Sequence, residues 1–211
     1  RFFYVNPLES NGDHHRQAWY GCACCPSQIS RFLPSIGNYI YGTSDKALWV
    51  NLFIGNTTEV TIDGKKVVMK QETDYPWDGL VKLTVTSEQP LGKELRIRIP
   101  GWCKSYTLSV NGNKVDSTTD KGYTVIKEWK TGDLIVLNMD MPVEKVSADP
   151  RVRQNTGKRA LQRGPLVYCL EETDNAKDFA DLALTPTSSF EVKDEPDNLG
   201  GILSLIHISE P

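Results

Sequence analysis

The segment 19-WYGCACCPSQISRFL-33 contains three cysteines within four positions, and two of them, Cys24 and Cys25, are adjacent. Thiols grouped in this way can bind a metal ion, supply a nucleophile or pack as small apolar side chains. A free thiol is mostly protonated at neutral pH, because its pKa is about 8.5. A bound metal ion or the N-terminal end of a helix favours the thiolate. The residue types alone leave the three roles open.

The other two cysteines, Cys103 and Cys169, lie far along the chain and are expected to be inert small apolar residues. An odd number of cysteines with an adjacent pair is not typical of a secreted disulfide framework. Adjacent cysteines form a disulfide only through a strained ring, so Cys24 and Cys25 are expected to be reduced. That favours a reducing compartment or a protecting metal. Cys22 could be a third ligand, but a packing role is favoured.

The residues that follow the cysteines predict a short helix. Pro26 suits the first helical turn, where its missing N–H has no partner to lose. Pro34 interrupts the pattern, so the helix is expected to kink or to end near residues 32–33. Gly37-Asn38 then provides a stop signal. The apolar residues at helical spacing are Ile29, Phe32, Leu33 and Ile36.

From residue 43 onward the pattern is typical of short β-strands. In 95-LRIRI-99 apolar and charged residues alternate, which indicates one buried and one solvated face. Asp63-Gly64 and Asn111-Gly112 favour tight hairpin turns. Strands of about six residues, spaced about ten apart, predict a mainly β fold with an antiparallel, jelly-roll-like β-sandwich. The expected strands are 47–55, 57–63, 65–73, 80–87, 94–100, 106–112, 123–129 and 133–141.

The C-terminal part indicates a second, incomplete β-unit. A polar, turn-rich break at 147–158 precedes one expected strand over 160–172, and a short helix is expected over 176–183. The tail 203-LSLIHISEP-211 follows a Gly-Gly pair and is expected to be non-native, with a short terminal strand as the alternative. The expected domain ranges are 1–42 for a loop and helix, 43–145 for the sandwich, 146–202 for the second unit and 203–211 for the tail.

Charge and hydropathy exclude two classes of partner. The chain has 24 basic and 27 acidic residues, a net charge of −3, and 39% apolar residues. This balance argues against a protein that binds nucleic acid, which needs a basic face. The sequence contains no apolar run long enough to cross a membrane, and its charge gives no attraction to an anionic membrane surface.

Five short motifs in order resemble glycoside hydrolase family 127, the β-L-arabinofuranosidases and their relatives. The motifs are 22-CACCP-26, 74-DYPWDG-79, 99-IPGWC-103, 110-VNG-112 and 161-LQRGPLVYCLEE-172. The resemblance covers about residues 1–172. It implies an (α/α)6 barrel that carries the active site, followed by two β-sandwich domains. The apolar, aromatic opening after Arg1 fits the middle of a protein, so the chain is expected to be a fragment that retains only the last loop and helix of the barrel.

The resemblance also implies a mechanism. Members of the family are retaining hydrolases with a zinc-bound cysteine nucleophile and a glutamate acid/base. In that pattern Cys24 is the nucleophile, and both Cys24 and Cys25 are zinc ligands. The remaining ligands and the glutamate would lie upstream of this sequence. The implied substrate is an L-arabinose-containing glycan, and the chain alone is expected to be inactive.

The alternative function is a non-catalytic carbohydrate-binding or scaffolding module, because residues 43–145 would form a complete domain without a barrel. Trp77 and Trp102 could stack on sugars, although packing is favoured for each. His14 and His15 are expected to be loop residues rather than metal ligands.

Glu171 and Glu172 resemble a paired-carboxylate site. Adjacent residues on a strand face opposite sides, so a solvated strand end is expected instead.

Overall fold

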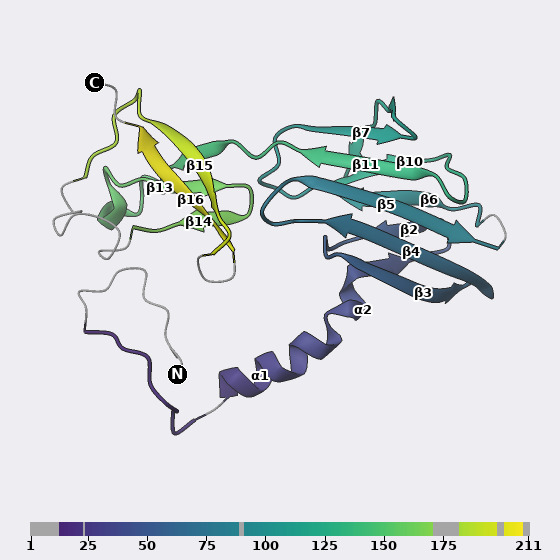
Figure 1. The fold of residues 1–211 in the computed structure, drawn as a ribbon, viewed down its shortest axis with the longest axis horizontal. Coiled ribbons are helices and arrows are strands. Elements are labelled where there is room, and N and C mark those ends of the chain that lie inside the picture. The colour runs from purple at the N-terminus through teal and green to yellow at the C-terminus, as the bar shows by residue number, and fades with distance from the viewer. Residues whose placement is uncertain (1–12, 23, 89–90, 171–181, 198–200, 209–211) are drawn as a thin grey trace.

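The computed structural model of the chain describes residues 13–22, 24–88, 91–170, 182–197 and 201–208. These residues form a two-sheet β-sandwich, preceded by a short helical segment and followed by a smaller β-unit (Figure 1). The prediction of a mainly β fold with antiparallel sheets is therefore confirmed. Within the described residues, no helix combines the length and apolar character needed to cross a bilayer.

The helical segment consists of α1 (Cys24–Phe32), a 3-10 turn (Leu33–Ser35) and α2 (Gly37–Ile40). The helix starts two residues before Pro26 and ends at Phe32, as Pro34 predicted, because a proline has no N–H with which to continue the α-helical ladder. The stop predicted at Gly37 is wrong. The N–H of Ile36 donates to Leu33 O at 3.3 Å, and this tight turn leads directly into α2.

One sheet of the sandwich has six strands in the order β3-β4-β5-β11-β7-β8, all antiparallel. The hairpin predicted at Asp63-Gly64 joins β3 to β4, and both turn residues have positive φ, 52° and 73°. Asn111-Gly112 likewise turns β7 into β8. The strand bounds are β3 (Asn56–Ile62), β4 (Lys65–Thr73), β5 (Leu80–Ser87), β7 (Tyr106–Val110), β8 (Asn113–Lys114) and β11 (Leu134–Met139).

The other sheet has five strands in the order β1-β2-β6-β10-β9. β2 pairs with β6 in parallel, whereas the other pairs are antiparallel. The expected strand 47–55 ends at Val50, because residues 51–55 cross to the six-stranded sheet. The side chain of Gln71 fastens this crossing by donating to Leu52 O and Ile54 O. The strand bounds are β1 (Tyr41–Thr43), β2 (Ala47–Val50), β6 (Glu94–Arg98), β9 (Thr119–Asp120) and β10 (Tyr123–Ile126).

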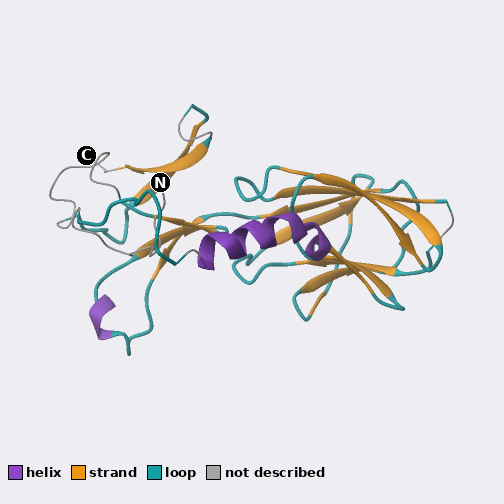
Figure 2. Ribbon diagram, turned by 90° about the horizontal axis from the view of Figure 1, so that it is seen from below, coloured by secondary structure: helices purple, strands orange, loops and turns teal. Residues whose placement is uncertain are grey.

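The core lies between the two sheets, which Figure 2 shows stacked face to face. Alternate residues of each strand point inward, as the period-2 pattern predicts. Each fully buried aliphatic side chain contributes about 1.5–3 kcal/mol. Residues with no exposed surface include Leu48, Val50, Val67, Val81, Leu95, Ile97, Ile135 and Leu137.

Lys93 is a buried cation at the edge of this core, only 5% exposed. Its ammonium donates to Ser44 O at 2.6 Å and to Asp45 O at 3.2 Å, and it pairs with Asp63 Oδ2 at 2.8 Å. Its own carbonyl accepts from Trp129 Nε1. Lys93 therefore ties the β1–β2 turn to the β3–β4 turn.

Gly79 lies against the backbone of β11, where the N–H of Met139 donates to Gly79 O at 3.0 Å. A Cβ at Gly79 would lie 2.0 Å from the carbonyl oxygen of Met139. We expect Gly79→Ala to lower the free energy of unfolding by at least about 2 kcal/mol, measured by urea denaturation. At Gly101 an added Cβ meets nothing within 4 Å, so Gly101→Ala is the matched control. Equal losses in the two variants would contradict this account.

The smaller β-unit has a three-stranded sheet in the order β12-β13-β14 and a hairpin of β15 with β16. The single strand expected over 160–172 is wrong. Gly164, with φ of 57°, starts a turn with Pro165 that folds the segment into the β13–β14 hairpin. The bounds are β12 (Val143–Val146), β13 (Ala160–Arg163), β14 (Leu166–Tyr168), β15 (Ser189–Glu195) and β16 (Ile202–Ile208), and a 3-10 turn spans Arg153–Asn155.

Most of the expected tail lies in β16, which pairs with β15 along its whole length. The short helix expected over 176–183 falls mainly on residues outside the described part.

The two β-units contact each other closely at their junction. Arg163 of β13 donates to Trp77 O at 2.8 Å. Lys104 pairs with Glu144 at 2.5 Å across the same boundary. A Cβ at Gly164 would lie 2.9 Å from Met141 Sδ, which shows how tightly the β13–β14 turn packs on the connecting segment.

Candidate functional site

The adjacent cysteines lie in the first turn of α1, which begins at Cys24. The two Sγ atoms are 3.8 Å apart, and both residues are exposed. Ser27 Oγ donates to Cys24 O at 2.9 Å and closes the turn. The first turn contains no acidic residue. The partial positive charge of the helix end therefore lies beside both thiols, with no opposing carboxylate in that turn.

The spacing of the two sulfurs fits one edge of a tetrahedral zinc site. Two thiolates bound to one zinc ion at about 2.3 Å each are about 3.8 Å apart. The observed Cys24–Cys25 separation has this value. The part of the chain that the structure describes contains no group of three or more His, Cys, Asp and Glu side chains that could hold a metal. It therefore offers two of four donors, and Cys22 does not complete a three-ligand cluster with them.

The apolar side of α1 is exposed. Ile29 and Phe32 of α1 are 58% and 48% exposed, Leu33 of the following 3-10 turn is 59% exposed, and α1 has no buried residue. Tyr39 of α2 is also exposed and lies 6.0 Å from the Phe32 ring. Adjacent exposed apolar side chains of this size are typical of a surface that another part of a protein covers.

Other residues considered in the sequence pack against the core or are exposed. Trp102 packs against the core and stacks on Tyr75 with ring centres 6.4 Å apart, as favoured. Trp77 is 42% exposed, so it is not a core residue. His14 and His15 lie exposed in a loop.

Two of the expected packing cysteines are exposed instead. Cys22 lies in the exposed loop before α1, and Cys169 lies just beyond the end of β14. Glu171 and Glu172 fall outside the described residues.

Cys103 packs partly against the core, as predicted, and its thiol donates to Ser105 O. Burial, with the Asp140 carboxylate adding to it, raises the pKa of this thiol. The thiolate fraction at pH 8 is therefore smaller than for an exposed cysteine. We expect Ellman's reagent to modify Cys103 at least roughly ten times more slowly than the other cysteines of metal-free protein. The exposed cysteines are Cys22, Cys24, Cys25 and Cys169.

Cys103→Ser should remove the slow phase of this reaction and leave the fast phase unchanged. Loss of a fast-reacting thiol in that variant would show that the assignment is wrong.

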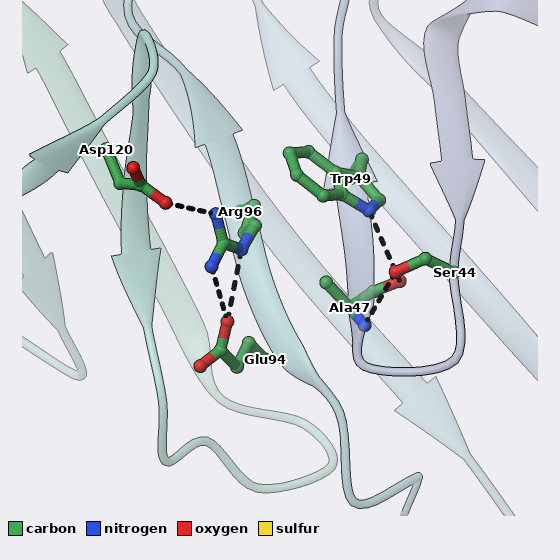
Figure 3. A network of polar contacts seen from close by, with 6 residues as sticks. All are labelled: Ser44, Ala47, Trp49, Glu94, Arg96 and Asp120. Atoms are coloured by element: carbon green, nitrogen blue, oxygen red, sulfur yellow. Dashed lines mark hydrogen bonds and ion pairs between the residues drawn. The ribbon is translucent and has the colours of Figure 1, made fainter.

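Sequence reasoning missed two polar groups. One is the buried Lys93 described above. The other lies on the outer face of the five-stranded sheet, where Arg96 contacts Trp49 and two carboxylates (Figure 3). The alternation in 95-LRIRI-99 predicts which face of β6 is solvated. Nothing in either strand's own sequence predicts that β2 and β6 pair in parallel.

Comparisons with known proteins give one family. Residues 1–38 match the β-L-arabinofuranosidase, GH127 catalytic domain, residues 47–141 match the GH127 middle domain, and residues 143–201 match the glycoside hydrolase family 127 C-terminal domain. The chain is 37% identical to a non-reducing end β-L-arabinofuranosidase of Bifidobacterium longum subsp. longum, over 96% of this chain and 33% of that protein. The chain thus spans about a third of the length of this curated relative.

Solved structures agree with this family. A GH127 β-L-arabinofuranosidase from Geobacillus stearothermophilus T6 superposes with a TM-score of 0.91 and 45% identity, covering 98% of this chain and 35% of that one. A second GH127 β-arabinofuranosidase gives a TM-score of 0.92 and 38% identity over the same shares. With three consecutive matched segments and this agreement in fold, the chain belongs to glycoside hydrolase family 127 and corresponds to a part of its longer members.

Proposed function

We propose that the chain is the C-terminal part of a retaining glycoside hydrolase that releases β-linked L-arabinofuranose, or a related sugar, from arabinose-containing glycans. Cys24 is the nucleophile in this proposal, and Cys24 and Cys25 are two ligands of a zinc ion. The observation that carries the proposal is the sulfur pair at 3.8 Å in the first turn of α1. That turn lies in the segment similar to the family's catalytic domain.

Zinc, when bound, stabilises the thiolate form of its cysteine ligands at neutral pH. The sulfur of Cys24 attacks the anomeric carbon, forming a C–S bond while the bond from that carbon to the leaving oxygen breaks. A general acid protonates the leaving oxygen, and water then hydrolyses the sugar–cysteine bond. Two successive inversions retain the configuration. The acid, expected to be a glutamate, is not assigned to any described residue.

The exposed apolar side of α1 supports a larger catalytic domain. Ile29, Phe32 and Leu33 would bury surface against further helices, at about 25 cal/mol for each Å² removed from water. In the proposed protein these helices complete the barrel and supply the remaining zinc ligands. The chain alone then lacks the acid and half of the metal site, and we expect it to hydrolyse no glycoside.

The test uses the full-length protein with 4-nitrophenyl β-L-arabinofuranoside. We expect nitrophenol release, a β-configured sugar as the first product by proton NMR, and about one zinc per chain by elemental analysis. An α-configured first product would exclude a covalent mechanism of this kind. Full activity in protein shown to be free of zinc would exclude the metal's role.

A further inference from the structure

The outer face of the five-stranded sheet carries a cluster that the proposed mechanism does not use. On β2 and β6 the neighbours of Trp49 and Arg96 in sequence are buried in the core, so these two side chains lie on the opposite face. They are also register partners across the parallel strands. We call this cluster the Trp49–Arg96 surface. It consists of Ser44, Asp45, Lys46, Trp49, Glu94, Arg96 and Asp120.

Arg96 holds the centre of this surface in place. Its guanidinium donates to Asp120 Oδ2 at 2.8 Å and, through two nitrogens, to Glu94 Oε2 at 2.9 and 3.1 Å (Figure 3). The guanidinium carbon is 5.0 Å from the centre of the Trp49 ring. Two carboxylates therefore pair with the Arg96 guanidinium on this outer face, and the Trp49 ring packs against it.

Trp49 is restrained from two further directions. Its indole Nε1 donates to Ser44 Oγ at 3.3 Å, and the Tyr123 ring contacts it at right angles with centres 4.8 Å apart. Ser44 Oγ also accepts from Ala47 N, so the turn before β2 is fixed as well. An aromatic ring held in this way loses little conformational freedom when a ligand contacts it.

Beside the ring is an open depression of about 580 Å³, lined by residues 44–47 together with Trp49, Glu94 and Arg96. This volume lies within the range of small-molecule sites, about 300–1,000 Å³. Among the residues that the structure describes, the Asp45 carboxylate and the Lys46 ammonium have no ion-pair partner. The depression thus combines an aromatic wall with a donor and an acceptor that are available to a ligand.

We propose that the Trp49–Arg96 surface binds a neutral oligosaccharide at a site separate from the cysteine pair. The lining includes two acidic residues, Asp45 and Glu94, and two basic residues, Lys46 and Arg96, so it favours neither an anion nor a cation. A sugar presents hydroxyls that both donate and accept, and C–H faces that pack on aromatic rings. That the ligand is a polyhydroxylated molecule follows from the aromatic ring, donor and acceptor of this surface. The choice of an L-arabinofuranosyl sugar rests on the proposed function.

The test follows the indole N–H signals of the 15N-labelled chain during titration with an L-arabinofuranosyl disaccharide. The chain has five tryptophans, and Trp49→Phe and Trp77→Phe assign the two signals needed. We expect a saturable shift of the Trp49 signal and none of Trp77. Lys46→Ala and Asp45→Ala remove solvated side chains without disturbing the core, and each should raise the Kd about fivefold, the effect of one lost hydrogen bond.

Three results would overturn the proposal: no saturable shift of Trp49, equal shifts of Trp49 and Trp77, or a shift that Cys24→Ser abolishes while Lys46→Ala leaves it unchanged. A shift that grows with protein concentration in the absence of sugar would instead identify an interface between copies. No hydrolysis is measured, so failure here is distinct from failure of the proposed nucleophile.

Discussion

Cys24→Ser in the full-length protein is expected to lower kcat for an arabinofuranoside by at least roughly 10³-fold. A serine hydroxyl has a far higher pKa than a thiol, so at neutral pH it supplies almost no anion to attack the anomeric carbon. The measurement is release of nitrophenol from the aryl glycoside at saturating substrate. Circular dichroism of the variant should match the wild type, because serine and cysteine are similar in size and in helix propensity.

Cys22→Ser is the matched control for this variant, since Cys22 is also exposed, lies two residues away and has no assigned role. Its activity should stay within about twofold of wild type, because exposed substitutions away from a site have small effects. Cys25→Ser should lower both activity and zinc content. Normal turnover by Cys24→Ser, or equal losses in Cys24→Ser and Cys22→Ser, would remove Cys24 as the nucleophile.

Lys93→Met is expected to destabilise the sandwich by about 3 kcal/mol. The substitution leaves the carbonyls of Ser44 and Asp45 without their shared donor, whereas the Asp63 carboxylate, 62% exposed, regains water. For a chain of this size the loss corresponds to a fall in Tm of roughly 6–12 °C. Urea denaturation followed by tryptophan fluorescence measures it.

The control for this variant is Lys127→Met, because Lys127 is exposed beyond β10 and makes no described ion pair. Its change should be within about 0.5 kcal/mol. Asp63→Asn keeps a residue that tolerates the positive φ at this position and should cost less than Lys93→Met. A Lys93→Met protein as stable as Lys127→Met would show that the buried ammonium is not needed.

The sequence predicted the sandwich well where the signals are local. Asp63-Gly64 and Asn111-Gly112 adopt positive φ and turn their hairpins as expected. Pro34 ended α1 where its missing N–H required it. Glycine, asparagine and proline act here through their own backbone conformation, so their effects can be predicted without knowledge of the rest of the fold.

Predictions failed where the local structure depends on contacts between residues distant in sequence. A third turn at Lys121-Gly122 and the turn at Gly164 were missed, because neither has the usual Asn-Gly or Asp-Gly signature. The sequence of residues 51–55 is typical of a β-strand. In the structure this segment crosses between the sheets, and the side chain of Gln71 donates to two of its carbonyls. Parallel pairing of β2 with β6 is likewise invisible in either strand alone.

The candidate site was only half predictable. Pro26 and the apolar spacing predicted Cys24 and Cys25 just before a helix, whereas the structure starts the helix at Cys24 and so includes both cysteines in its first turn. Their sulfur separation depends on backbone and rotamer geometry, which only the structure gives. The Trp49–Arg96 surface unites residues from separate strands and turns, so no single stretch of sequence contains it.

The junction between the β-units has a mechanical consequence. β11 and β12 are joined by residues 140–142 alone, and proline at 142 stiffens that short connection. The side chain of Arg163 donates a hydrogen bond to Trp77 O, and the turn at Gly164 packs against Met141. These contacts restrain the connection, so it does not serve as a hinge. A force applied to the three-stranded sheet would therefore be transmitted to the sandwich rather than absorbed between them.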